Sequence, residues 1–325
     1  MTVPMVTGKI SAVVVTWNSA REIGGCLSSL SSDAALSEII VVDNASLDAT
    51  REIVRGYPLA RLMENAENSG FAAAANQGIA ESAGEFIFLV NPDVSFKDGF
   101  LSTLAAGLES DPAAGAAAPR LLRPDGKTID SAGLVMRKNR KAIDCGRDLP
   151  DSAEFSSPCR VFGACGAAAL YRRSMLEDTK ISGECFDESF FAYKEDVDLA
   201  WRANLMGWKT IYVPKAIAFH SRGWKGKPGG GLSGRRSMPR EIRRHSHKNR
   251  YLSILKNDDP VNFVKDLPYI MPYEFKLILF SLFFEPFLLM AFWDIIRLLP
   301  ETLRKRREIM SRRKTSPSGM RRLFV

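Results

Sequence analysis

Short apolar runs recur along the first hundred positions of this chain, and stretches of mixed polarity with helical spacing separate them. Residues 10–15, 39–42 and 86–90 are almost entirely apolar, and each run stops at polar residues. Runs of this length are typical of strands buried on both faces of a sheet. Strands and helices alternating at this spacing predict a mostly parallel, Rossmann-like sheet with right-handed crossovers. We predict the helices at about residues 20–30, 50–55 and 71–82, and a further short strand at 62–63.

Polar residues follow each predicted strand at the point where it ends. Pro92 cannot donate to a ladder, so the strand over 86–90 should stop before it and leave Asp93 just past its carboxyl end. In open α/β sheets, ligands bind at that edge. A capped turn explains any one of these sites, but three at one edge favour a nucleotide pocket, with Asp43 placed to accept from a ribose hydroxyl or a base N–H. The residues concerned are Thr16, Trp17 and Asn18, then Asp43 and Asn44, then Asn91 and Asp93.

The alanine-rich helix that begins at Phe71 opens with Gly70. A helix N-terminus exposes backbone N–H groups and partial positive charge, so it is suited to face a phosphate. Neither a Gly-x-Gly-x-x-Gly nor a Walker sequence accompanies it. A small-residue helix packed closely on the sheet is the alternative interpretation, and both can hold together.

The middle of the chain has weaker periodicity. We expect residues 119–160 to form an irregular excursion with a hairpin over one edge of the sheet. Residues 160–171 are predicted to be one strand whose small side chains let a substrate approach the backbone. Residues 207–214 are predicted to be a turn and an edge strand.

Acidic residues concentrate between positions 187 and 198, where five fall within twelve residues. A helix from about Glu195 to Met206 places Asp198 and Arg202 on one side. Acids in a first helical turn are favoured by the macrodipole, but five exceed that need, and one is predicted to be a general base held against a sugar. His220, one of three histidines, follows a strand that returns to the carboxyl edge of the sheet, although a lone histidine is more often structural.

The ordered set of motifs over residues 10–222 resembles the inverting family 2 glycosyltransferases with a GT-A fold, and most closely their rhamnosyltransferase-like branch. This resemblance implies transfer of a sugar, with rhamnose a candidate, from a nucleotide-diphosphate donor such as dTDP-rhamnose or a UDP-sugar. It implies a lipid-linked or polysaccharide acceptor in cell-envelope glycan synthesis. The matching stretches are 13–18, 41–46, 68–71 with 76–78, 91–93 and 191–199.

The resemblance also implies residue roles. Asp93 would hold Mg²⁺ or Mn²⁺ against the donor diphosphate, with His220 as a further metal contact. Asp196, in the Glu195–Asp196 pair, would be the catalytic base. The chain departs from many relatives in having Asn91-Pro92-Asp93 in place of Asp-x-Asp, which is common in the rhamnosyltransferase-like branch. The residues implied to bind the nucleotide sugar are Thr16, Trp17, Asn18, Asp43, Asn44, Gly70, Phe71, Asn76, Asn91 and Asp93.

These residue types suit the chemistry independently of the resemblance. A nucleoside diphosphate leaving an anomeric carbon develops negative charge, which a hard metal ion with oxygen ligands neutralises. The attacking hydroxyl must lose a proton to a carboxylate within hydrogen-bond reach. With an oxocarbenium-like transition state and one base opposite the leaving group, the product is inverted.

The C-terminal part is apolar and then basic. Residues 275–299 are densely apolar but carry Glu285-Pro286 and Asp294, so we predict a broken pair of helices lying in a membrane interface instead of a simple span. Basic clusters follow, and each cation near an anionic lipid surface contributes about 1 kcal/mol to the free energy of membrane binding. Nucleic-acid binding is the rival use of this charge, but no nucleic-acid motif accompanies it, so none is predicted. The clusters are at 304–307, 312–314 and 321–322.

Composition sets the remaining expectations. The 325 residues carry a formal net charge of +8, which indicates an anionic partner. Five cysteines without a Cys-x-x-Cys pair indicate a reduced compartment. The apolar run near the N-terminus is too short for a secretory signal, so we expect a cytoplasmic protein attached peripherally to the inner face of the plasma membrane. The predicted parts are a GT-A domain at 1–225, a flexible Gly/Arg-rich loop at 226–240 and a membrane-associating helical segment at 241–325.

Two other functions fit part of this pattern. A nucleotidyltransferase that makes nucleotide sugars would want a Gly-rich, basic loop after the first strand, and Thr16-Trp17-Asn18 is not such a loop. A non-catalytic, membrane-bound protein that binds sugar nucleotides is the other alternative.

Overall fold

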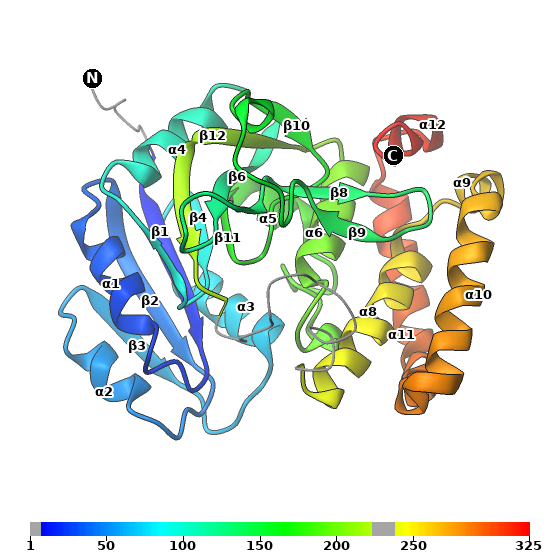
Figure 1. Cartoon of the computed structure of the whole chain (residues 1–325), viewed down its shortest axis with the longest axis horizontal. Coiled ribbons are helices and arrows are strands. Elements are labelled where there is room, and N and C mark those ends of the chain that lie inside the picture. Colours follow the sequence, from blue (N-terminus) through cyan, green and yellow to red (C-terminus); the bar gives the residue numbers. More distant parts are fainter. Residues whose placement is uncertain (1–7, 223–237) are drawn as a thin grey trace.

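A ten-stranded mixed sheet with helices on both faces forms the body of the protein (Figure 1). The computed structural model describes residues 8–222 and 238–325. The N-terminal half of the sheet is parallel, as predicted, and every residue of its two central strands is buried. Its strands lie in the order β4 (Phe86–Val90), β1 (Ile10–Thr16), β2 (Leu36–Asp43) and β3 (Ala60–Glu64).

Alternate residues of these strands build two separate cores. Val14 faces α1 (Ile23–Ser32), α2 (Thr50–Arg55) and α4 (Phe100–Glu109). Val13 faces α3 (Phe71–Glu81), α5 (Arg173–Thr179) and α6 (Glu195–Leu205). The small residues of α3 are explained by close packing, because a Cβ on Gly78 would lie 2.4 Å from Val13 Cγ1.

The C-terminal half of the sheet corrects two predictions. Residues 160–171 are not one strand: β10 (Cys159–Val161) lies at the outer edge, whereas β11 (Ala168–Arg172) lies between β6 (Ala114–Leu122) and β4. The predicted edge strand is also wrong, since β12 (Lys209–His220) is internal and continues past Pro214 at a register shift between Val213 and Ile217.

The alanine-rich β6 was not predicted because alanine carries little strand preference. β5 (Val94–Phe96) pairs with β12, β7 (Ile129–Ser131) pairs with β6, and β8 (Leu134–Met136) with β9 (Ala142–Asp144) forms the predicted hairpin.

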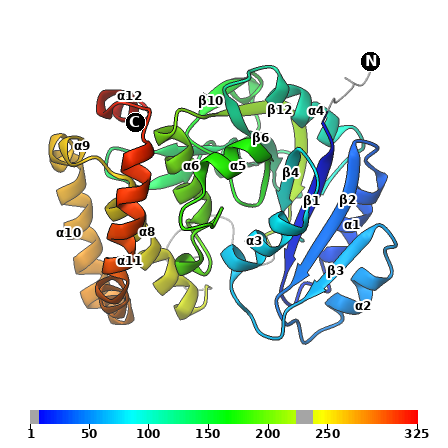
Figure 2. The same cartoon turned by 180° about the vertical axis from the view of Figure 1, so that it is seen from behind.

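The C-terminal helices lie against α6, beside the sheet (Figures 1 and 2). The predicted break in the apolar segment is present, since α10 ends at Phe284 and a 3₁₀ turn, Pro286–Leu289, precedes α11. Ile309 and Phe324 share a core with Trp201 of α6. The predicted flexible loop falls mostly on residues 223–237, outside the described residues, as does the predicted domain limit at 225. The helices are α8 (Arg240–Asn257), α9 (Pro260–Lys265), α10 (Leu267–Phe284), α11 (Met290–Arg312) and α12 (Pro317–Arg321).

Candidate active site

Asp93 and His220 meet at the carboxyl end of β4. Asp93 follows that strand, and His220 ends β12 opposite Val94. The His220 Nε2 atom lies 3.3 Å from Asp93 Oδ1, and its Nδ1 atom lies 2.8 Å from Asp130 Oδ2. Burial acts to lower the pKa of His220, but hydrogen bonds to Asp130 and Asp93 outweigh it and raise the pKa to about 9. The structure thus brings together the two residues predicted as metal contacts.

Asp130 orients this histidine and was missed in the sequence. Its carboxylate is fully buried in β7. Burial opposes its ionisation, but hydrogen bonds from His220 and Arg222 lower its pKa to about 2. The Nδ1–H of His220 donates to Asp130 and its Nε2 faces Asp93, so a metal bound there would replace the Nε2 proton while the carboxylate of Asp130 holds the ring in place. A single acid in a stretch without periodicity gave no pattern to detect.

The Asp93–His220 pair fits a divalent cation that is completed by substrate. Carboxylate oxygen suits Mg²⁺ and Mn²⁺, and an imidazole nitrogen is compatible with Mn²⁺. Within residues 8–222 and 238–325, no group of three or more His, Cys, Asp and Glu side chains is arranged to hold a metal. The remaining ligands would therefore come from the donor diphosphate and water.

A strained loop presents the two candidate catalytic acids at the start of α6. Phe191, Tyr193 and Lys194 have φ angles of 64°, 72° and 74°, which non-glycine residues rarely adopt. Such conformations persist only where the surroundings hold them, and they concentrate at functional sites. Here the buried Asn249 of α8 holds the loop, with its Nδ2 atom 2.7–3.0 Å from the carbonyl oxygens of Phe190, Ala192 and Tyr193.

Asp196 is connected to the end of β4 by two hydrogen bonds. Its Oδ2 atom accepts from the Gly166 N–H at 2.9 Å. The neighbouring Ala167 carbonyl accepts from the Asn91 N–H at 2.8 Å. This path puts Asp196 at the same edge of the sheet as Asp93. The pKa of Tyr193 is raised by burial and by the charges of Glu195 and Asp93, which places its phenol within electrostatic range of both.

The two acids differ in environment. Burial, and then the charge of Asp196, raises the pKa of Glu195 to about 8. Burial also raises the pKa of Asp196, but Lys194 and the N–H groups of Gly166 and Val197 oppose that rise. The carboxylate with two N–H donors is expected to ionise first, so we assign the charge of the pair to Asp196 and the proton to Glu195.

Asp43 lies at the same edge of the parallel sheet, but its carboxylate already accepts hydrogen bonds from other residues of the protein. It is fully buried, and its carboxylate accepts from Thr16 Oγ1 at 3.0 Å, from the Ser46 N–H at 2.9 Å and from Arg51 Nε at 2.6 Å. Its contact with a nucleotide stays a prediction. Trp17 is 52% exposed, and Asn18 is exposed beside it, so both are available to line a pocket.

The residues predicted around α3 are engaged by the protein itself, and their contact with a nucleotide sugar stays a prediction. Asn76 accepts through Oδ1 from the Phe186 N–H at 2.9 Å and donates through Nδ2 to the Phe186 carbonyl at 2.8 Å. We call the strained loop at residues 191–194, with the two acids that follow it, the acid loop. A Cβ on Gly70 would lie 2.6 Å from Phe191 Cδ2, so this glycine permits close packing under the acid loop. Asn44 donates to the Gly70 carbonyl at 3.0 Å. Phe71, half-buried, is the first residue of α3.

Two of the five clustered acids are structural. Lys305 of α11 pairs with Asp187 at 2.7 Å, and Lys256 of α8 pairs with Asp198 at 3.0 Å. Asp198 also pairs with Arg202 at 3.0 Å, as their spacing predicted. All five side chains are buried. The C-terminal helices therefore hold the acid loop, which sequence reasoning missed because more than fifty residues separate these partners.

Known proteins are similar to this chain in sequence and in fold. A family model described as "Glycosyl transferase family 2" matches residues 11–179. The N-acetylglucosaminyl-diphospho-decaprenol L-rhamnosyltransferase of Mycobacterium tuberculosis is 31% identical over 241 residues, which cover 66% of this chain and 77% of that protein. TarS from S. aureus in complex with UDP-GlcNAc superposes with a TM-score of 0.58 at 19% identity, over 97% of this chain and 90% of that chain. A mannosyltransferase from Pyrobaculum calidifontis in complex with GDP-Man and Mn²⁺ gives a TM-score of 0.53 at 20% identity, over 91% and 77%.

Proposed function

Because this chain belongs to glycosyl transferase family 2, in its rhamnosyltransferase-like branch and with a GT-A fold, we propose that it transfers rhamnose from a nucleotide-diphosphate donor to a lipid-linked diphosphate sugar in cell-envelope glycan synthesis. One observation carries the proposal: Asp93 with His220, and Asp196 with Glu195, lie at one edge of the sheet and are joined through Asn91, Ala167 and Gly166. A charge-binding pair and a carboxylate base are the two groups that inverting transfer requires.

In this mechanism Asp196 receives the proton of the acceptor hydroxyl as that oxygen attacks the anomeric carbon. Glu195 stays protonated, so the pair of acids carries a single negative charge, which is on Asp196. Asp93 and His220 would hold Mg²⁺ or Mn²⁺, which supplies positive charge to the leaving diphosphate when bound. Asp130 fixes the imidazole, and Asn249 fixes the loop that carries the base.

The choice of donor and acceptor is supported by the relatives. The M. tuberculosis enzyme is named for rhamnosyl transfer to an N-acetylglucosaminyl-diphospho-lipid. The structural neighbours were solved with UDP-GlcNAc, or with GDP-Man and Mn²⁺. We infer dTDP-rhamnose as the donor, a lipid-linked acceptor and a divalent metal for this chain as well.

A donor screen followed by a transfer assay tests this function. Of a panel of nucleotide sugars, dTDP-rhamnose with Mg²⁺ or Mn²⁺ is expected to give the largest rise in Tm. It should then label an N-acetylglucosaminyl-diphospho-lipid in a metal-dependent reaction. Stabilisation without transfer would favour the non-catalytic binding protein. If a UDP-sugar is the one member of the panel that stabilises the protein, the proposed donor is that UDP-sugar and not dTDP-rhamnose.

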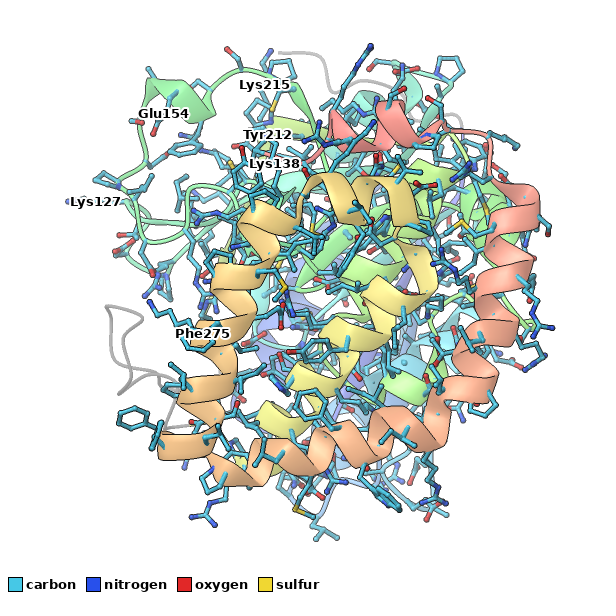
Figure 3. All side chains as sticks on the ribbon, turned by 90° about the vertical axis from the view of Figure 1, so that its right-hand side faces the viewer. Lys127, Lys138, Glu154, Tyr212, Lys215 and Phe275 are labelled. Atoms are coloured by element: carbon cyan, nitrogen blue, oxygen red, sulfur yellow. The ribbon has the colours of Figure 1, made fainter. Side chains whose placement is uncertain are left out.

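We also propose that α10 and the start of α11 rest on an anionic membrane. In the part of the chain that the structure describes, α10 alone is long and apolar enough to cross a bilayer. Exposed apolar side chains lie along α10 and the start of α11, and together they form the proposed surface; Figure 3 views the molecule from the side of these helices. Exposed cations at Lys276 and Arg297 border it, complementing anionic lipid. Glu285, buried at the break and paired with Arg243, favours two helices lying on the surface over one span. The exposed apolar residues include Phe275, Ile278, Leu282, Phe283, Phe284, Met290, Trp293 and Ile296.

The double variant Phe283→Glu/Trp293→Glu is expected to lose at least about tenfold in binding to vesicles containing phosphatidylglycerol, since each ring contributes about 2 kcal/mol on leaving water. The two rings are 75% and 72% exposed, so folding should be unaffected. Leu59→Glu/Leu149→Glu changes two exposed residues outside these helices and is the control, expected to bind as wild type. Co-sedimentation measures both. Wild-type protein that resists extraction from membranes by alkaline carbonate would contradict peripheral attachment.

A further inference from the structure

A cavity of about 190 Å³ lies between the acid loop and the membrane-facing helix. Residues of the β8–β9 hairpin, the start of α6, α8 and α10 line it. Figure 1 shows where these elements lie in the fold. Lys194 and Val197, which flank the two candidate catalytic acids, line one side. Tyr273 and Leu277 of α10 line another. Its volume is about six times the ~30 Å³ share of one water in the liquid, enough for a polar group larger than a water molecule.

The cavity wall is basic. Five cationic side chains contribute to it, and no Asp or Glu is among its lining residues. The acids that face these cations stand outside the cavity. Glu274 pairs with Arg250 at 2.5 Å, Glu285 pairs with Arg243, and Asp258 and Asp266 pair with Arg140 at 2.7 and 2.8 Å. Lys194 lies beside Glu195 and Asp196. The lining cations are Arg140, Lys141, Lys194, Arg243 and Arg250.

Several buried polar atoms of the wall have no partner among the described residues. Arg250 donates through Nη2 to the Asn139 carbonyl at 2.9 Å, but its Nε and Nη1 atoms find no acceptor within residues 8–222 and 238–325. The Ser253 hydroxyl, one helical turn further along α8, is equally unsatisfied and only 2% exposed. Leaving buried donors unpaired is costly, so a group of such atoms around one cavity indicates a ligand that accepts hydrogen bonds.

We propose that this cavity binds the diphosphate of the lipid-linked acceptor. The inference rests on the proposed function and names a subsite for it. A diphosphate bears several acceptor oxygens and at least two negative charges, which guanidinium and hydroxyl donors match. From this position the acceptor sugar reaches the acid pair past Lys194, and the lipid chain leaves along α10, whose outer face is apolar.

Two mild substitutions test the subsite. Arg250→Lys keeps the charge opposite Glu274 but removes the guanidinium donors that have no partner among the described residues. Ser253→Ala removes one hydroxyl. With an N-acetylglucosaminyl-diphospho-lipid as acceptor, each is expected to raise the acceptor KM about tenfold, while kcat and the donor KM stay unchanged. With an alkyl N-acetylglucosaminide, which lacks the diphosphate, neither variant should differ from wild type. Arg244→Lys is the matched control, because Arg244 is on the same helix, pairs with Asp294 and does not line the cavity.

A binding measurement separates this inference from the proposed function. Inorganic diphosphate in the presence of EDTA should raise the Tm of the wild-type protein by about 2–4 °C, and Arg250→Lys and Ser253→Ala should abolish the rise. If diphosphate raises the Tm of the wild type but not of the variants, and no acceptor is glycosylated, the proposed function is wrong and the anion site is supported. Equal Tm shifts in wild type and both variants, or equal KM changes with both acceptors, would overturn the subsite. Loss of binding to phosphatidylglycerol vesicles in the same variants would assign it to phospholipid headgroups instead.

Discussion

Asp196→Asn is expected to lower kcat for sugar transfer by about 10³-fold, while donor binding and Tm change little. The substitution removes the carboxylate that accepts the proton from the attacking hydroxyl. The asparagine oxygen can still accept from the Gly166 N–H, which Asp196 binds at 2.9 Å, so the loop should keep its conformation. Steady-state kinetics with saturating donor, together with a thermal melt, measure both effects. Near-normal turnover in this variant would remove Asp196 from the role of base.

Glu195→Gln is the matched control on the adjacent residue. With a pKa of about 8, Glu195 is mostly protonated at pH 7, so a neutral amide preserves its charge state. We expect kcat within about threefold of wild type at pH 7. In both proteins activity should fall at low pH, as Asp196 becomes protonated. Near pH 8 the wild type should change more than Glu195→Gln, because only it can ionise residue 195, whereas His220, with a pKa of about 9, titrates in both proteins. A loss in Glu195→Gln as large as that in Asp196→Asn would mean that the two acids act as one unit.

Asp93→Ala is expected to abolish detectable transfer, with a loss of at least about 10³-fold in kcat/KM. Asp93 is the acid that would hold the metal against the leaving diphosphate, and its carboxylate also faces His220 at 3.3 Å. The metal-dependent part of the Tm rise with nucleotide should disappear as well, which a thermal melt with and without EDTA measures. Asp98→Ala, an exposed acid five residues further along, should match wild type.

The metal assignment makes a graded prediction for Asp130. Asp130→Asn leaves Asp93 and His220 in place but weakens the orientation of the imidazole, so metal affinity should fall by about 10–100-fold. Excess Mn²⁺ should restore much of the activity of this variant, and none of the activity of Asp93→Ala. Unchanged metal dependence in both variants would refute a metal at this edge of the sheet.

The sequence alone determined the parallel half of the fold and the edge of the sheet at which the candidate site lies. Buried strands such as 86–90 are recognisable because every side chain must be apolar, and the polar residues after them stand at the carboxyl edge for topological reasons. The positions of Asp93 and Asp196 followed from local pattern and from the order of motifs. The break at Glu285-Pro286 was equally local, since proline cannot continue a helix there.

Only the tertiary structure decided which side chains support that edge. Asp130 lies ninety residues before His220, and Lys305 lies 118 residues after Asp187, so no local pattern links them. Asn76 and Asn44 had the composition of ligands but are engaged by backbone groups of Phe186 and Gly70. The strands of the C-terminal half gave little signal because alanine and glycine fit them through packing with distant residues. Local sequence specifies conformation and burial, whereas partnership between distant polar groups depends on the packing that brings them together.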